Sequence, residues 1–368
     1  NEYAELSEKA NDFDRGLMQE AIAVGGKEYA ELCALAYRQA ISAHKLVVSN
    51  EGFLMFLSKE NNSNGSIGTV DITYPSLPIF LKYNPELAKA LMNHIFHYSE
   101  SGRWTKPFPA HDIGTYPLAN GQTYKHDMPV EEAGNMLVGV AAVCAYGGSA
   151  EYAKEHWDMM TVWANYLCEF GLDPENQLCT DDFAGHFAHN ANLSIKAIMG
   201  IASYARMAEM LGYHDVSQKY MSIAKELAGQ WEDMAVEGDH YKLTFDRPGT
   251  WSQKYNLVWD NLLNLAILDD SVMDVEIPYY LSKQNQYGLP LDSRSTYSKS
   301  DWIIWTASMA DNEEDFRAFI TPLWKFYNET VDRVPMSDWF YTDKPEHCMF
   351  IGRSVVGGYF IKLLPKVE

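Results

Sequence analysis

The sequence lacks several patterns that would assign it to a common class of protein. No apolar run approaches the roughly 18 residues that span a bilayer, so we expect no membrane insertion. The chain also contains no Walker loop, no GxGxxG after a predicted strand and no GxSxG elbow. These absences argue against P-loop, dinucleotide-binding and α/β-hydrolase chemistry.

Positive charge is scarce. The chain has 29 Lys and Arg against 50 Asp and Glu, which gives a net charge of −21. An excess of negative charge repels phosphate backbones and anionic lipid surfaces. We therefore expect a small polar molecule as the partner, and neither a nucleic acid nor a membrane.

Cysteine is scarce as well. The five Cys form an odd set without a CxxC pair, so neither a disulfide framework nor a zinc cluster is indicated. We expect no metal and no other cofactor. The chain starts at Asn1 without a Met, which suggests a trimmed piece of a longer protein and leaves the missing signal peptide uninformative.

Helical periodicity dominates what is present. It predicts helices at about 5–23, 28–46, 86–99, 131–146, 149–169, 186–211, 214–235, 255–268, 299–310, 313–330 and 349–364. Strand signals are few, and at most a short β-hairpin is expected near 52–72, across the turn at 61–65. The fold class is therefore all-α.

The turns indicate how these helices are arranged. Tight turns fall near 25–26, 84–85, 147–148, 212, 269–270 and 311–312, a spacing of one helical hairpin plus one loop. This spacing predicts that residues 1–368 form a single (α/α)6 toroid of six hairpins, closed by the last helix. The connections between hairpins are long, at about 50–74, 101–130, 171–185, 237–254, 285–298 and 332–347. In an antiparallel array they all emerge at one end, and long loops in a compact domain are usually functional.

These loops and their flanks carry carboxylates, mostly with Trp or Tyr beside them. Carboxylates accept hydrogen bonds from hydroxyl and amide groups, and aromatic faces stack on organic ligands. We therefore predict a binding site for a polar organic substrate at the loop end of the ring. The candidate substrate-binding residues are Asp71, Trp104, Asp112, His186, Asp292, Arg294, Trp302, Asp338 and Trp339.

Glu132 and Asp182 are the candidate catalytic residues, because two carboxylates in different environments can divide the acid and base roles. Each has an acidic neighbour, Glu131 or Asp181, and adjacent helical residues point about 100° apart. Only one of each pair is therefore expected to face the site. Structural alternatives are a first-turn role for the glutamates and helix capping by one of the two aspartates.

His186 and His189 stand three residues apart and could share a helix face as metal ligands. No HExxH or similar pattern accompanies them, which favours two structural histidines. Asp338 and Trp339 could equally form a simple turn and a core anchor.

Seven stretches of the chain, in order, resemble the helical-hairpin domain of the glutaminase A family. They are 71–75 (DITYP), 111–117 (HDIGTYP), 129–137 (PVEEAGNML), 180–186 (TDDFAGH), 289–294 (LPLDSR), 299–302 (KSDW) and 335–339 (PMSDW). The resemblance implies an (α/α)6 toroid, an N-terminal β-rich domain that is missing here, and an exported (secreted or periplasmic) protein. It also implies hydrolysis of glutamine to glutamate and ammonia.

The residues alone leave two enzymatic interpretations open, besides a non-catalytic binding domain. As a glutamine amidohydrolase, the protein would hold the α-carboxylate with Arg294 or Arg353 and the α-ammonium with Asp112 or Asp338. As a glycoside hydrolase, it would use Glu132 and Asp182 as acid and base and stack Trp104, Trp302 and Trp339 on the sugar.

Overall fold

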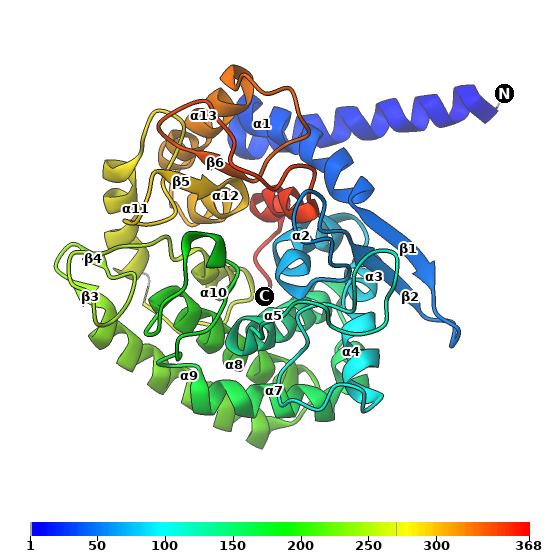
Figure 1. Ribbon diagram of the computed structural model, residues 1–368, viewed down its shortest axis with the longest axis vertical. Helices are drawn as coiled ribbons and strands as arrows, with labels where there is room; N and C mark the ends of the chain where they lie inside the picture. The colour runs from blue at the N-terminus through cyan, green and yellow to red at the C-terminus, as the bar shows by residue number, and fades with distance from the viewer. Residues whose placement is uncertain (1, 270) are drawn as a thin grey trace.

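The computed structural model describes residues 2–269 and 271–368, and it is a ring of helices (Figure 1). Six helical segments line the inside of the ring: α2 (Val70–Tyr83), α5 (Pro129–Gly147), α8 (Ala191–Met210), η2 (Tyr255–Leu257) with α10 (Val258–Leu262), α12 (Ser300–Ser308) and the 3-10 helix η3 (Ser354–Leu363). Each contacts the next, and η3 closes the ring between α12 and α2. The predicted toroid is confirmed.

The outer helices pack against this inner ring. They are α1 (Glu2–Ser42), α3 (Pro85–Ala90), α4 (Asn93–Glu100), α6 (Glu151–Glu155), α7 (Trp157–Phe170), α9 (His214–Ala235), α11 (Ser271–Lys283) and α13 (Glu313–Glu329). Inner α8 is buried on nearly every side, whereas outer α9 is buried along one stripe only. An apolar sequence all round a helix requires neighbours all round, which is why these segments form the inner ring.

The first helix differs from its predicted course. Gly26 has φ 85° and ψ 177°, so α1 is kinked there. Its N-terminal part, residues 2–16, is mostly exposed and extends away from the ring, whereas α1 packs on α13 and η3 (Figure 1). We predicted that this helix runs to residue 46. The helix instead ends at Ser42. The prediction was wrong because the β-prone run at 44–48 leaves the helix to pair as a strand.

The predicted hairpin near 52–72 is displaced along the chain. Strand β2 (Leu54–Ser58) pairs antiparallel with β1 (His44–Val48), not with residues 66–72. Residues 66 and 67 form only isolated bridges, and Val70 already begins α2. The wrong partner was chosen because the Asn-rich turn at 61–65 outweighed the shorter turn around Gly52, whose φ is 92°.

Two helices of the structure were not predicted, and both contain proline. Helix α2 includes Pro75 and Pro78, and α11 includes Pro278. Proline removes a backbone donor and usually ends a helix, which argues against a helix at these positions. As a consequence Asp71, predicted in a loop, lies in the first turn of α2.

The last predicted helix is shorter and tighter than expected, since residues 354–363 form a 3-10 helix.

At the loop end, β5 (Tyr297–Lys299) pairs with β6 (Trp339–Tyr341), which joins the fifth long loop to the sixth. A smaller pair, β3 (Val236–Glu237) with β4 (His240–Tyr241), lies in the fourth. No helix within the described residues is both long and apolar enough to cross a membrane.

Helices α5 and α8 approach closely through two glycines. A Cβ on Gly200 would lie 2.8 Å from Leu167 Cδ1 and 3.1 Å from Gly134 Cα. Gly200→Ala should therefore lower the free energy of unfolding by about 1–3 kcal/mol. Gly229→Ala is the matched control, because an added Cβ in the middle of α9 meets no atom within 4 Å. It should raise stability by about 1 kcal/mol. Urea denaturation of both variants tests this, and equal shifts would contradict it.

Candidate functional site

The long loops meet over a small cavity of about 150 Å³ at one end of the ring. Its lining comes from five separate segments and includes Glu60, Asp71, His111, Tyr124, Asp182, Phe350 and Arg353. Larger hollows of about 700 and 790 Å³ lie at the tight-turn end and on the outside of the ring. Among the described residues, neither is lined by a convergent group of buried titratable side chains, so the small cavity is the candidate site.

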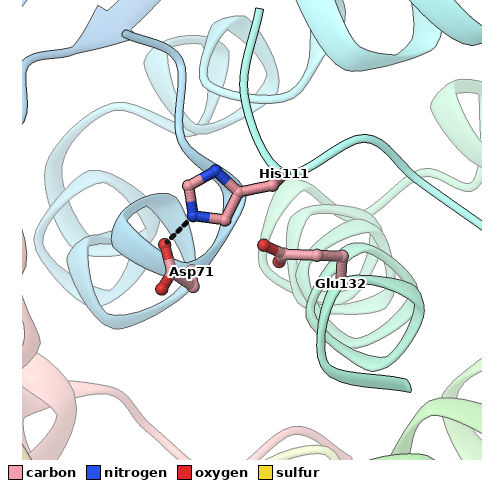
Figure 2. A group of neighbouring side chains, drawn as sticks. All are labelled: Asp71, His111 and Glu132. Atoms are coloured by element: carbon pink, nitrogen blue, oxygen red, sulfur yellow. Dashed lines mark ion pairs between the residues drawn. The ribbon is translucent and has the colours of Figure 1, made fainter. Parts of the chain in front are cut away.

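Three buried side chains converge beside this cavity, as Figure 2 shows: Asp71 from α2, His111 from the second long loop and Glu132 from α5. One ligating atom from each lies within 4.8 Å of the others. The distance from His111 Nε2 to Asp71 Oδ1 is 3.6 Å. We refer to these residues as the Asp71–His111–Glu132 group.

Burial and mutual repulsion set the protonation of this group. Burial raises the pKa of Asp71 to about 7, although the charge of His111 opposes the shift. Burial, then the charges of Asp71 and Glu131, raise the pKa of Glu132 well above its ordinary value. Burial favours the neutral imidazole, but the hydrogen bond to Asp112 and the charge of Asp71 outweigh it and raise the pKa of His111. The group therefore favours shared protons or a bound positive charge.

Asp112 holds His111 in place. Its Oδ2 lies 2.9 Å from His111 Nδ1 and accepts the Tyr124 N–H at 3.1 Å. Its Oδ1 accepts the backbone N–H of Gly114 at 2.8 Å and that of Thr123 at 2.9 Å. Both oxygens are thus occupied inside the protein. Burial alone would raise the pKa of Asp112, but these hydrogen bonds lower it below the ordinary value.

The two adjacent glutamates point to different partners, as their step around the helix predicts. Glu131 Oε1 lies 3.0 Å from Lys196 Nζ. The Lys196 ammonium also sits 3.5 Å above the Tyr74 ring. Glu132 turns instead toward Asp71 and His111, and its Oε2 accepts the Asn135 amide at 3.0 Å. Of the two, Glu131 is therefore paired with a lysine, and Glu132 is the carboxyl that belongs to the candidate site.

Asp181 and Asp182 form the turn that begins the short 3-10 helix η1 (Asp182–Ala184). Tyr124 Oη donates to Asp182 Oδ2 at 2.8 Å, and Tyr255 Oη donates to Asp181 Oδ2 at 2.9 Å. Burial raises the pKa of Asp182, and burial raises that of Asp181 to about 7. The expectation that one of them caps a helix was wrong: neither caps a backbone N–H, and Asn190 caps α8 instead.

Asp292 and Arg294 brace this turn from the fifth loop. Arg294 Nε donates to both oxygens of Asp292 at 3.0 Å, and its Nη1 donates to the carbonyls of Ala184, at 2.9 Å, and Gly185. The guanidinium is thus committed to the protein. Both residues hold the Asp182 segment and do not line the cavity.

A buried ion network lies beneath the site. Arg353 bonds to Asp338 through two nitrogens and to Glu60 Oε2 at 3.3 Å, while Lys299 Nζ lies 3.2 Å from Asp338 Oδ2. Burial would raise the pKa of Asp338, but the charges of Arg353 and Lys299 lower it. Asp338 is therefore a structural anion, and Arg353 and Glu60 are the members of the network that line the cavity.

The predicted aromatic and histidine residues are dispersed. Trp302 is fully buried and stacks on Tyr255 at 4.0 Å between ring centroids. Trp339 packs on Phe350, and the Trp104 indole donates to the Phe108 carbonyl away from the cavity. His186 and His189 do not converge: their Nδ1 atoms pair with Asn176 and Asp173, each at 2.7 Å.

The sequence did not single out most of the residues that line the cavity, among them Glu60, His111, Tyr124 and Phe350. His111 is the one that could have been found, because it opens the HDIGTYP stretch directly before Asp112. The sequence does not show which of these two neighbours faces the cavity, because that depends on the backbone geometry that directs Asp112 into the protein. The other three have no signal in their surrounding sequence.

Among solved structures, the ring resembles those of glycosidases. A glycosidase with bound glucose aligns with a TM-score of 0.63 at 12% identity, covering 91% of this chain and 96% of that one. A metal-independent alpha-mannosidase of Streptococcus pneumoniae aligns with a TM-score of 0.65 at 12% identity, covering 97% of each chain. At such identities the likeness concerns the fold alone, and the class defined is a six-hairpin ring with a loop-end site.

Sequence comparison identifies the family. Residues 26–363 match the glutaminase A six helical-hairpin domain, so the chain belongs to the glutaminase A family. Glutaminase A of Aspergillus oryzae (strain ATCC 42149 / RIB 40) is 34% identical over 374 residues, covering 99% of this chain and 54% of that protein. A probable glutaminase of Arthroderma benhamiae is 29% identical over 443 residues, covering 95% and 51%. The chain spans about half the length of these relatives.

The buried Asp181 carboxyl makes stability depend on pH. Its folded pKa, about 7, lies above the ordinary 3.8, so its contribution is full below pH 4 and is lost as pH rises through 7. Asp181→Asn keeps an acceptor for Tyr255 but cannot ionise. Relative to wild type, the variant should gain a few kcal/mol of unfolding free energy between about pH 4 and pH 7.

Urea titrations of both proteins across that pH range measure the difference. Asp343→Asn, an exposed carboxyl in the sixth loop, is the control and should change stability by less than about 0.5 kcal/mol. Parallel pH profiles for wild type and Asp181→Asn would contradict the interpretation.

Proposed function

We propose that this domain hydrolyses the side-chain amide of glutamine, releasing glutamate and ammonia, in the cavity at the loop end of the ring. One observation carries the proposal: the cavity is small and lined by three carboxyls, one guanidinium and one imidazole. Membership of the glutaminase A family supports it.

The size and charge of the cavity suit a free amino acid. Pockets for drug-sized ligands measure about 300–1,000 Å³, so a cavity of about 150 Å³ fits one small molecule. Glu60, Asp71 and Asp182 form a wall that favours an ammonium group. Arg353 is the guanidinium that lines the cavity, and an α-carboxylate would share it with Asp338 and Glu60. Arg294, the alternative proposed from the sequence, does not line the cavity and binds Asp292 and backbone carbonyls.

The lining favours direct attack by water over a covalent intermediate. Cys179 is buried, and burial raises the pKa of its thiol well above the ordinary value, so it is a poor nucleophile. Ser63 and Thr180 line the cavity, but among the residues described here neither hydroxyl donates a hydrogen bond to a His or Lys that could act as its base. A carboxylate that activates water needs no such partner.

Asp182 is the proposed base. The hydroxyl of Tyr124 holds one of its oxygens and leaves the other available. Asp182 would accept a proton from water as the oxygen attacks the amide carbon, and the C–N bond would then break. The Asp71–His111–Glu132 group, next to the same cavity, would supply positive charge to the amide oxygen and a proton to the departing ammonia. In this scheme Glu132 and Asp182 keep the two catalytic roles predicted from the sequence.

A glycoside hydrolase is the second candidate. Tyr124 and Phe350 offer aromatic faces at the cavity, and Glu132 with Asp182 would be the acid and base. Two of the predicted stacking residues do not support this: Trp302 is inside the core, and Trp104 lies elsewhere. Export of the protein and a further N-terminal domain stay predictions from the family resemblance.

Ammonia release from glutamine by the full-length protein tests the proposal. Asp182→Asn should lower kcat by about 10²–10⁴-fold, the usual contribution of a general base. Glu132→Gln should also abolish most of the activity. Asp173→Asn, in the same loop but exposed, should retain wild-type activity.

A panel of aryl glycosides assayed beside glutamine separates the two candidates. Glutamine turnover without sugar release would support the amidohydrolase. Sugar release that Asp182→Asn abolishes, with no ammonia from glutamine, would overturn it in favour of the glycosidase.

A further inference from the structure

We propose that Asp71, His111 and Glu132 bind a divalent transition-metal cation, with Zn²⁺ the best match. The proposal concerns metal binding itself and does not depend on the hydrolysis of glutamine. It departs from the sequence analysis, which predicted no metal.

The geometry of the group is close to a coordination shell. His111 Nε2 and Asp71 Oδ1 are 3.6 Å apart, and all three ligating atoms lie within 4.8 Å of one another (Figure 2). With metal–ligand bonds of about 2.1 Å, ligands in a tetrahedron are about 3.4 Å apart. Side-chain shifts of about 1 Å would therefore complete the shell.

Two oxygens in the group lack a hydrogen bond. Glu132 Oε1 and Asp71 Oδ1 are buried and accept no hydrogen bond from any described residue. Glu132 is 0% exposed, and its carboxyl group points toward His111 and Asp71 (Figure 2). Buried acceptors without a partner are costly and rare in native proteins. The neighbouring Glu131 shows the alternative, since Lys196 neutralises it at 3.0 Å.

His111 has the support typical of a metal ligand. Metal-binding histidines usually donate their second N–H to a carboxylate, which fixes the ring and its tautomer. Asp112 Oδ2 lies 2.9 Å from Nδ1, and backbone N–H groups of Gly114, Thr123 and Tyr124 hold that carboxylate rigidly. This arrangement directs Nε2 at Asp71 and Glu132. His189, by comparison, pairs with Asp173 on the surface, outside this group.

The ligand types and the surroundings select the ion. One imidazole nitrogen with two carboxylate oxygens suits Zn²⁺ or Mn²⁺, whereas Ca²⁺ needs six to eight oxygens. Three protein ligands leave a fourth position open, which is the pattern of catalytic zinc sites. Asp71 and His111 also line the cavity, so that position would face the substrate. The nearby carboxylates of Glu60 and Asp182 add further attraction for a cation.

Calorimetric titration of the EDTA-treated 368-residue chain with Zn²⁺ tests the proposal directly. We expect one saturable site with a micromolar or tighter Kd. Glu132→Gln and His111→Gln should weaken binding at least 100-fold, and Asp112→Asn, which weakens the support of His111 without removing a ligand, should weaken it 10–100-fold. Mg²⁺ and Ca²⁺ should not compete at equal concentration.

His189→Asn is the matched control, because it removes a histidine–aspartate pair of the same type outside the group. Asn also tolerates the left-handed backbone at this position, where φ is 64°. This variant should bind Zn²⁺ as tightly as the wild type. A rise in Tm on adding Zn²⁺, present in the wild type and in His189→Asn but lost in Glu132→Gln, would give an independent readout.

The absence of saturable Zn²⁺ binding by the wild type would overturn the proposal. So would a site that His111→Gln and Glu132→Gln leave unchanged. If those variants fail to fold, Co²⁺ added to the wild type decides: visible bands of four- or five-coordinate Co²⁺, displaced by Zn²⁺, support the site, and their absence refutes it. A protein that binds zinc but does not hydrolyse glutamine would contradict the proposed function alone.

Discussion

Arg353 joins the end of the chain to its beginning, and the closed ring depends on that connection. It lies directly before η3, the last inner segment, and its guanidinium bonds to Asp338 in the sixth loop and to Glu60 in the first. Its backbone carbonyl accepts the Gln39 side chain from α1. Breaking a buried pair strands a charge in the interior, which costs several kcal/mol. The interaction that closes the ring therefore also fixes one wall of the cavity.

The buried carboxyls of this protein fall into three groups according to their partners. Some meet a buried cation, as Glu131 meets Lys196 and Asp338 meets Arg353 and Lys299. Asp112 instead receives backbone N–H groups. Asp71 and Glu132 each keep a buried oxygen that accepts no hydrogen bond from the described residues, although Lys196 pairs with the adjacent Glu131. Because perturbed groups of this kind concentrate at functional sites, their position beside the cavity distinguishes function from structural pairing.

The sequence predicted the ring well and the site only in outline. Period and turn spacing depend on local chemistry, and α9 was predicted at its observed bounds, 214–235. Helices α2 and α11 were not predicted, because they contain proline, which locally disfavours a helix. Tertiary packing outweighs that local preference in the structure. The gathering of acidic loops at one end followed from topology. Topology did not predict which carboxyl remains available to a ligand. In the sequence, Asp338 and Asp182 are both acidic loop residues, and only the structure shows that Asp338 is paired with Arg353.

The ring and its chemistry are separable in physical terms. The inner helices are held by apolar contacts and by glycines that allow close approach, as at Gly134 and Gly200. Proteins with only 12% identity share this ring, so the scaffold tolerates almost complete change of sequence. The loops contribute less to this apolar packing, and outside the Arg353 network they can change charge without unfolding the ring. A cavity walled by carboxyls therefore reflects selection for what enters it, and a substrate with an ammonium group, or a cation that assists its cleavage, would explain that wall better than a neutral sugar.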